Sequence, residues 1–178
     1  PTSTRGLISS SRWRWRTIAP NAELNCLTLG GVGAGTTLEY IQCHNGTDDA
    51  FEWFGGNVNA KYLVATGNDD DNLDMDFGFS GRIQYVYVRT DSQVDTADGR
   101  CVESDNATST GNQNALPRTQ PRIANLTCSG PQGFEALRLR RGSAGNYYNS
   151  VFTGYPICND TAATEIYTAA GTPGALSG

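Results

Sequence analysis

The chain has 178 residues, of which 38% are hydrophobic and 17% charged, which excludes a disordered chain and allows one domain with a substantial core. No apolar run approaches the roughly 20 residues of a transmembrane helix, so we expect no membrane insertion. The formal net charge of −5 argues against nucleic acid as a partner, because attraction to phosphate needs a basic surface. The 21 glycines, with abundant Asn, Asp and Thr, favour a turn-rich β protein.

The first distinct element is the alternating run RWRWR at 12–16. On a strand, Trp13 and Trp15 would face one way and the arginines the other. Two interpretations stay open: one more coil strand with the tryptophans inward, or a patch that contacts a glycan or another subunit. Because the chain begins at Pro1, without Met or a signal peptide, we expect a processed or partial product.

A strand–turn–strand unit then recurs about every 22 residues. TDDAFEWFGG at 47–56 is followed by DDDNLDMDFG at 69–78, and LEYI at 38–41 is followed by AKYL at 60–63 and IQYV at 83–86. A period in the low twenties is typical of one coil of a β-solenoid. In such a coil, each strand pairs in parallel with its equivalent one coil away, about 4.8 Å distant.

The later copies are CVES at 101–104, IANL at 123–126, GFEA at 133–136 and a partial YNSVF at 148–152. We expect a single β-helix domain over residues 1–178, divided into a first coil or N-terminal edge (1–25), regular coils (26–155) with insertions near 91–99 and 107–120, and a C-terminal tail (156–178).

Equivalent side chains of such coils should stack in columns. One predicted inward column is Phe51, Leu73, Val102 and Phe134. A second inward column is Ile41, Leu63, Val86 and Leu126. A predicted outward acidic column is Glu52, Asp74, Glu103 and Glu135. A predicted aromatic column is Tyr40, Tyr62 and Tyr85, continued by Asn125 and Asn149. Aromatic columns stabilise solenoids, and an exposed one also suits contact with sugar rings or another subunit.

The repeated acids form the main candidate site. Those expected to cluster are Asp48, Asp49, Glu52, Asp70, Asp71 and Asp74. Carboxylates about 5 Å apart repel by on the order of 1 kcal/mol per pair even in water. A Ca²⁺ ion would offset this repulsion with carboxylate and carbonyl ligands. Two alternatives are turn capping, in which the acids accept backbone hydrogen bonds, and catalysis by paired carboxylates of a glycoside hydrolase.

The single histidine and the five cysteines constrain the chemistry. Because His44 is the single histidine, the sequence excludes multi-histidine zinc sites and weakens a Ser–His–Asp proposal. We expect His44 to face solvent before a turn. Cys43 and Cys128 fall in one column and Cys26 and Cys101 in another, each pair about 14 Å apart, beyond the roughly 7 Å Cα limit for a disulfide. The repeat therefore predicts mostly free, buried thiols.

The strings LNCLTLGGVGAGTTLEYIQCHNGTDDAFEWFGGNVNAKYLVATG, DDDNLDMDFGFSGRIQY and VESDN resemble a group of exported bacterial proteins of the pectate-lyase-like superfold. The resemblance spans about 20–130 and implies a right-handed parallel β-helix and export. Most members have no established activity, so it implies little about chemistry. Members are usually longer at the N-terminal side and tend to have Gly where Cys26 and Cys101 stand here.

The sequence thus predicts an all-β, right-handed parallel β-helix of about five coils. The expected function is an exported, non-catalytic structural or adhesive module outside the cell or at its surface, which self-associates into a fibre or layer. The alternative is a polysaccharide lyase or glycoside hydrolase, or a glycan-binding module, working along the acids. A lyase would use Ca²⁺ and an arginine base, and Arg82 and Arg122 occupy equivalent positions, although on another strand.

Overall fold

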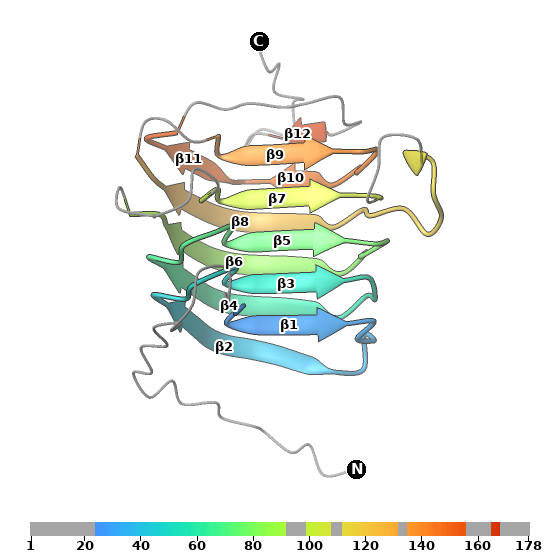
Figure 1. The fold of residues 1–178 in the computed structure, drawn as a ribbon, viewed down its shortest axis with the longest axis horizontal. Helices are drawn as coiled ribbons and strands as arrows, with labels where there is room; N and C mark the ends of the chain where they lie inside the picture. The colour runs from blue at the N-terminus through green and yellow to red at the C-terminus, as the bar shows by residue number, and fades with distance from the viewer. Residues whose placement is uncertain (1–23, 92–98, 108–111, 132–134, 156–164, 168–178) are drawn as a thin grey trace.

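A computed structural model of the protein describes residues 24–91, 99–107, 112–131 and 135–155, together with the backbone of 165–167. Its strands form two parallel sheets that enclose one apolar core (Figure 1). The chain alternates between the sheets, so each coil adds one strand to each sheet, and the protein is a parallel β-helix. Within the described residues, no helix is long and apolar enough to cross a membrane.

The short sheet contains, in spatial order, β1 (Leu27–Gly30), β3 (Phe51–Phe54), β5 (Leu73–Asp76), β7 (Val102–Asp105) and β9 (Leu137–Arg140). The long sheet contains β2 (Thr37–His44), β4 (Asn59–Thr66), β6 (Arg82–Arg89), β8 (Arg122–Ser129), β10 (Asn146–Tyr148) and β12 (Glu165–Tyr167). A further strand, β11 (Val151–Thr153), pairs with the second half of β8.

The strand register confirms the predicted stacking over most of the helix. Phe51 pairs with Leu73, and Leu73 pairs with Val102. The second inward column runs, as predicted, through Ile41, Leu63, Val86 and Leu126. These apolar columns fill the space between the sheets, so the hydrophobic effect stabilises the contact between neighbouring coils as well as the fold of each coil.

The predicted register is wrong at the last short strand. Val102 pairs with Leu137 and Glu103 with Arg138, in place of the predicted Phe134 and Glu135. The LRLR sequence alternates strictly, which buries Leu137 and Leu139 and turns the arginines outward. Phe134 lies outside the described residues. The acidic column therefore ends in an arginine.

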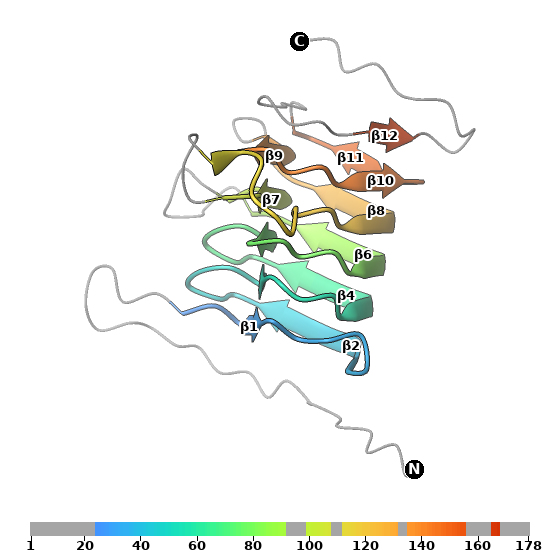
Figure 2. The same ribbon diagram turned by 90° about the vertical axis from the view of Figure 1, so that its right-hand side faces the viewer.

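β2, β4, β6 and β8 each turn a corner at the fourth residue, where the backbone is left-handed, and the residue after β10 repeats this conformation. The residues at this corner have φ between 45° and 59°: Tyr40, Tyr62, Tyr85, Asn125 and Asn149. The paired register skips these positions, because a left-handed residue leaves the ladder. Asn adopts this conformation readily, whereas a bulky residue does so at a cost. The tyrosine side chains at this corner are exposed. Figure 2 shows the strands of the long sheet stacked one above another, seen from the side.

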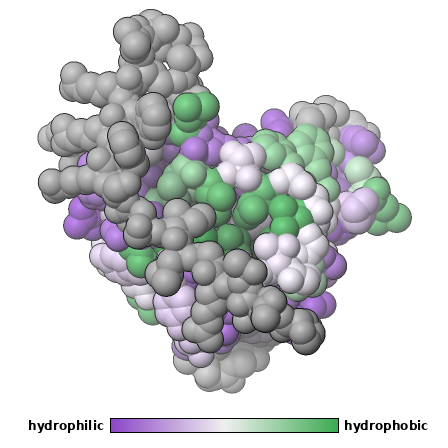
Figure 3. Space-filling view, turned by 90° about the horizontal axis from the view of Figure 1, so that it is seen from below, coloured by the Kyte–Doolittle hydropathy of each residue, from purple (hydrophilic) through white to green (hydrophobic). Residues whose placement is uncertain are grey.

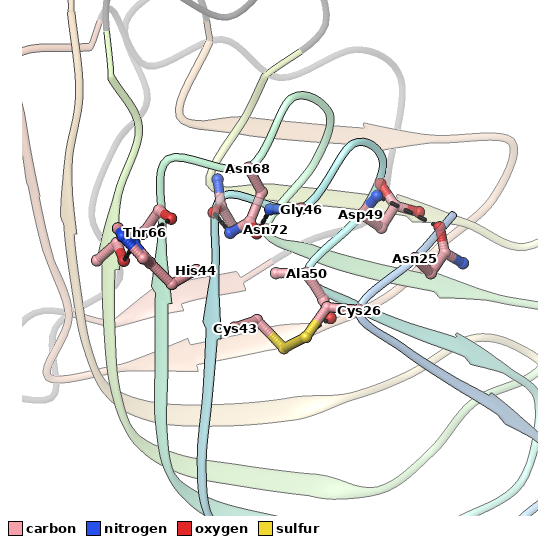
Figure 4. Close-up of a disulfide and its surroundings, with 10 residues drawn as sticks. All are labelled: Asn25, Cys26, Cys43, His44, Gly46, Asp49, Ala50, Thr66, Asn68 and Asn72. Atoms are coloured by element: carbon pink, nitrogen blue, oxygen red, sulfur yellow. Dashed lines mark hydrogen bonds between the residues drawn. A yellow bond between two sulfur atoms is a disulfide. The ribbon is translucent and has the colours of Figure 1, made fainter. Parts of the chain in front are cut away.

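Two disulfides correct the prediction of free thiols. Cys26 is bonded to Cys43, and Cys101 to Cys128, with Cα–Cα distances of 5.9 and 6.1 Å. Each joins the residue before a short strand to the end of the next long strand, so it links the start of one coil to its end; Figure 4 shows Cys26–Cys43. The prediction compared cysteines only along the columns, where the spacing is indeed too long. Cys158 lies outside the described residues.

Candidate functional site

The predicted acids gather on one side of the molecule, at the turns that lead into the short strands and on the outer side of those strands. We call this region the acidic face; it consists of Asp48, Asp49, Glu52, Asp70, Asp71, Asp74 and Asp76. The pairing of β3 with β5 places Glu52 beside Asp74, as predicted. The same register places Asp49 one coil from Asp71, two residues before each strand.

A ladder of hydrogen bonds ties these turns together. The backbone N–H of Asp71 donates to Oδ1 of Asp49 at 3.0 Å, and the backbone N–H of Arg100 donates to Oδ1 of Asp71 at 2.8 Å. At the other end, the N–H of Asp49 donates to Oδ1 of Asn25 at 3.3 Å (Figure 4). Asp49 and Asp71 therefore cap turns, one of the interpretations that the sequence left open. Each cap joins two successive coils.

The same carboxylates crowd one another. Two groups of three have ligand atoms within 4.8 Å of each other: Asp48, Asp49 and Asp70, and Asp49, Glu52 and Asp74. Among the described residues, the one amide that donates a hydrogen bond to the carboxylate of Glu52 is the side-chain amide of Asn25. Oδ1 of Asp74 is buried and has no hydrogen-bond partner. Negative charge is thus concentrated where water cannot solvate it fully.

Burial and mutual repulsion shift the titration of this cluster. Burial first, and then the charges of Asp71 and Asp70, raise the pKa of Asp49 to about 9. Burial and neighbouring carboxylates also raise the pKa of Asp74 well above its usual range. The pKa of Asp76 rises to about 6, again mainly because of burial. These carboxyl groups favour a proton or a cation over the free charged form.

Beyond β5 the acids are neutralised by arginines. Arg100 is only 1% exposed; its Nε lies 3.0 Å from Glu135, and its Nη1 lies 3.6 Å from Glu103 and 3.8 Å from Asp71. Arg140 makes a two-pronged contact with Asp105, at 2.9 and 3.0 Å. Further ion pairs join Arg138 to Glu103 and Glu135, and Arg141 to Asp105.

Sequence reasoning did not single out Asn25, Asp105 or the arginines at 100, 138, 140 and 141 as parts of this face. Two signals were available. Asn25 and Arg100 lie two residues before Leu27 and Val102, just as Asp49 lies two residues before Phe51. The strict alternation of LRLR at 137–140 predicts a strand more clearly than GFEA at 133–136 does. Neither signal shows which acid each arginine contacts.

The tyrosine column lies along the corner of the long sheet, away from the acids. The rings of Tyr40 and Tyr62 stack with centroids 4.6 Å apart, and those of Tyr62 and Tyr85 at 5.3 Å. They border an open groove of about 530 Å³ whose lining includes Gln42, Val64 and Tyr87. Because the rings cover one another's faces, they present mainly edges to the groove. The column is confirmed; contact with a glycan or subunit stays a prediction.

Other candidates lie apart from the acids. Arg82 and Arg122 pair at the start of β6 and β8, so they are equivalent but belong to the long sheet. His44 ends β2 and is exposed, with Nδ1 2.8 Å from Oγ1 of Thr66 (Figure 4). Trp13 and Trp15 lie outside the described residues, so their predicted contacts are untested.

Two parallel sheets wound coil upon coil, with turns capped in register, define a parallel β-helix. A family model described as a pectate-lyase like beta helix domain matches residues 13–172, most of the chain. The chain belongs to this family. A search of curated proteins found no match, and neither did a search of solved structures.

Proposed function

We propose that the protein is an exported, non-catalytic β-helix module with a structural or adhesive role. The observation that carries the proposal is the use of the acids as inter-coil caps. Oδ1 of Asp49 and Oδ1 of Asp71 each accept a backbone N–H from the next coil. A carboxylate fixed in this way stabilises the stacking of coils and has less freedom to reach a substrate.

The arginines of the short sheet support the same proposal. A lyase would need an arginine whose proton can leave, close to the acids. Those on the described short sheet and its turns, at 100, 138, 140 and 141, all contact carboxylates within ion-pair distance. Ion pairing stabilises the charged guanidinium and opposes its action as a base, although burial lowers the pKa of Arg140.

The disulfides support export. Cys26–Cys43 and Cys101–Cys128 each join the start of one coil to its end. Disulfides of this structural kind persist in oxidising compartments and are rare in the reducing cytosol. The disulfides therefore support the proposal that the protein acts outside the cell or at its surface.

The exposed end of the helix supports self-association. Among the described strands, β1 and β2 pair on one side only. Figure 3 views this end and shows apolar surface there, and the partly buried side chains near it are Leu27, Val32 and Ile41. Unpaired strand edges promote association with further strands. Light scattering at high concentration and electron micrographs should show oligomers or fibres; a monodisperse monomer would refute this part of the proposal.

An enzymatic alternative is favoured by one observation. Asp76 has a pKa of about 6 and lies close enough to Glu52 and Asp105 for their charges to raise it. A carboxylic acid with such a pKa suits a general acid in glycoside hydrolysis. Incubation with uronic-acid polymers separates the two functions: a scaffold releases no unsaturated or reducing ends, whereas an enzyme releases them and loses activity in Asp76→Asn.

A glycan-binding module is a third reading, favoured by the groove beside the tyrosine column. None of its lining residues carries a formal charge, which would suit a neutral glycan. Glycan-array binding that is lost in Tyr87→Thr, without any product, would support this reading.

A further inference from the structure

One part of the acidic face has the properties of a cation site. The ligand oxygens of Asp49, Glu52 and Asp74 lie within 4.8 Å of one another. Asp49 and Glu52 come from one coil and Asp74 from the next. Three carboxylates in this space repel strongly, and their surroundings among the described residues offer few hydrogen-bond donors.

Asp74 supplies an independent observation. Its Oδ1 atom is buried in the protein and accepts no hydrogen bond. A buried carboxylate oxygen without a donor is costly, and such atoms are rare in folded proteins. Asp74 belongs to the same cluster as Asp49 and Glu52, so a cation bound there would give its carboxylate a partner.

We propose that Asp49, Glu52 and Asp74 bind one Ca²⁺ ion, which staples two successive coils of the β-helix. Ca²⁺ takes 6–8 oxygen ligands at 2.3–2.6 Å, so two oxygens on opposite sides of the ion are roughly 4.6–5.2 Å apart. The separations in this cluster, up to 4.8 Å, fit inside that span. Mg²⁺ forms shorter octahedral bonds of about 2.0–2.1 Å and usually keeps several waters, so a site built from several carboxylates suits Ca²⁺ better.

The second acidic group, Asp48, Asp49 and Asp70, shares one residue with this site. Oδ1 of Asp49 already accepts the N–H of Asp71, so the second oxygen of Asp49 can serve only one of the two groups well. We call Asp49, Glu52 and Asp74 the inner group and Asp48, Asp49 and Asp70 the outer group. The buried Oδ1 of Asp74, which accepts no hydrogen bond, favours the inner group. The ion therefore belongs to the inner group. This inference is independent of the proposed function, since an ion that joins coils would serve a scaffold or an enzyme.

The site also has a built-in optical reporter. Trp53 lies next to Glu52 on β3, and its side chain is fully buried in the core directly behind the short sheet. Tb³⁺ replaces Ca²⁺ in oxygen-rich sites and emits when a nearby tryptophan transfers energy to it. Titration with TbCl₃ should give sensitised emission that saturates at one ion per chain, and CaCl₂ should reverse it.

Thermal unfolding gives the second readout. Without chelator, CaCl₂ at 100 times the dissociation constant should raise Tm by roughly 5–10 °C, and MgCl₂ should have a smaller effect. Asp74→Asn, which preserves the shape of the side chain, should weaken Ca²⁺ binding at least tenfold and so remove about half of the shift or more at the same CaCl₂ concentration. Asp70→Asn, in the outer group, and Glu39→Gln, on the long sheet, are the matched controls and should keep it.

Each outcome decides the proposal. A Tm that does not respond to Ca²⁺, with no saturable Tb³⁺ emission, overturns it. A response that survives in Asp74→Asn but is lost in Asp70→Asn moves the ion to the outer group and also overturns it. If Asp74→Asn unfolds the protein, calorimetric titration of Asp49→Asn replaces it, with the same tenfold loss expected.

Discussion

The two halves of the short sheet share one register but differ in how they manage stacked charge. Between β3 and β5, Glu52 lies beside Asp74, and burial first, then neighbouring carboxylates, raise the pKa of both groups. Between β7 and β9, Glu103 lies beside Arg138, and the acids are neutralised by ion pairs. The parallel pairing of strands fixes which positions lie side by side, but it does not determine the sign of the charge at each position. The acids of the C-terminal half are thus neutralised by arginines of the same chain, whereas the acids of the N-terminal half need a proton or a cation to offset their charge.

The largest expected effect tests the neutralised half. Arg100→Met should lower the free energy of unfolding by about 3–5 kcal/mol, because it leaves the buried carboxylate of Asp71 without its compensating charge. Urea denaturation measures the loss. Arg89→Met is the control, since Arg89 pairs with Asp91 at the surface and should cost less than about 1 kcal/mol. Equal losses in the two variants would mean that burial of Arg100 has no energetic role.

The disulfides allow the two halves to be compared directly. Replacing both cysteines of either pair by alanine should cost about 3 kcal/mol, because the bond restricts the unfolded chain. The separations are 17 residues for Cys26–Cys43 and 27 for Cys101–Cys128, so the second loss should be larger by a few tenths of a kcal/mol. Unfolding with and without a reductant provides the check. A variant as stable as the oxidised parent would contradict the expectation.

The pH dependence should come from the acidic half. Asp49 has a pKa of about 9 in the folded protein and an ordinary value near 3.8 when unfolded. The folded state therefore binds the proton more tightly; this contribution to stability is complete below the unfolded pKa and is lost as pH rises towards 9. In chelator, the protein should lose on the order of 2 kcal/mol between pH 5 and pH 8.5.

Asp49→Asn keeps the side-chain acceptor and removes the titrating group, so its stability should vary less over the same pH range. Denaturation midpoints at the two pH values measure both proteins. If the unmodified protein is instead more stable at pH 8.5, burial does not dominate the titration of this cluster.

The smallest effect concerns the corner of the long sheet, which both halves share. Tyr62→Asn should cost about 1–2 kcal/mol through two lost ring contacts, since Asn adopts the left-handed backbone readily. Tyr62→Val should cost about 1–2 kcal/mol more, because a β-branched residue is strained there. Tyr87→Thr, outside the stack, serves as a near-neutral control. Equal stability of the Asn and Val variants would rule out backbone strain as the cause.

Much of the fold could be predicted because a solenoid repeats its environment. Equivalent positions of each coil require the same type of residue, whether apolar, polar or turn-forming. Phe51, Leu73 and Val102 could therefore be aligned from sequence alone. The alignment failed at β9, where a connection of different length carries the chain from β8 to Leu137. The candidate acids were found for the same reason as the strands. Their arginine partners were missed, because ion pairing depends on side chains from three coils.

The amino-acid sequence by itself determined the period, and with it the columns of stacked residues, because equivalent positions in parallel strands face the same surroundings. Only the tertiary structure decided what lies across a coil. The distance from Cys26 to Cys43 depends on how the coil brings the end of β2 back to the start of β1, and the isolation of Asp74 Oδ1 depends on every neighbour packed around it. Periodicity describes the direction along the helix axis, whereas these contacts run across it.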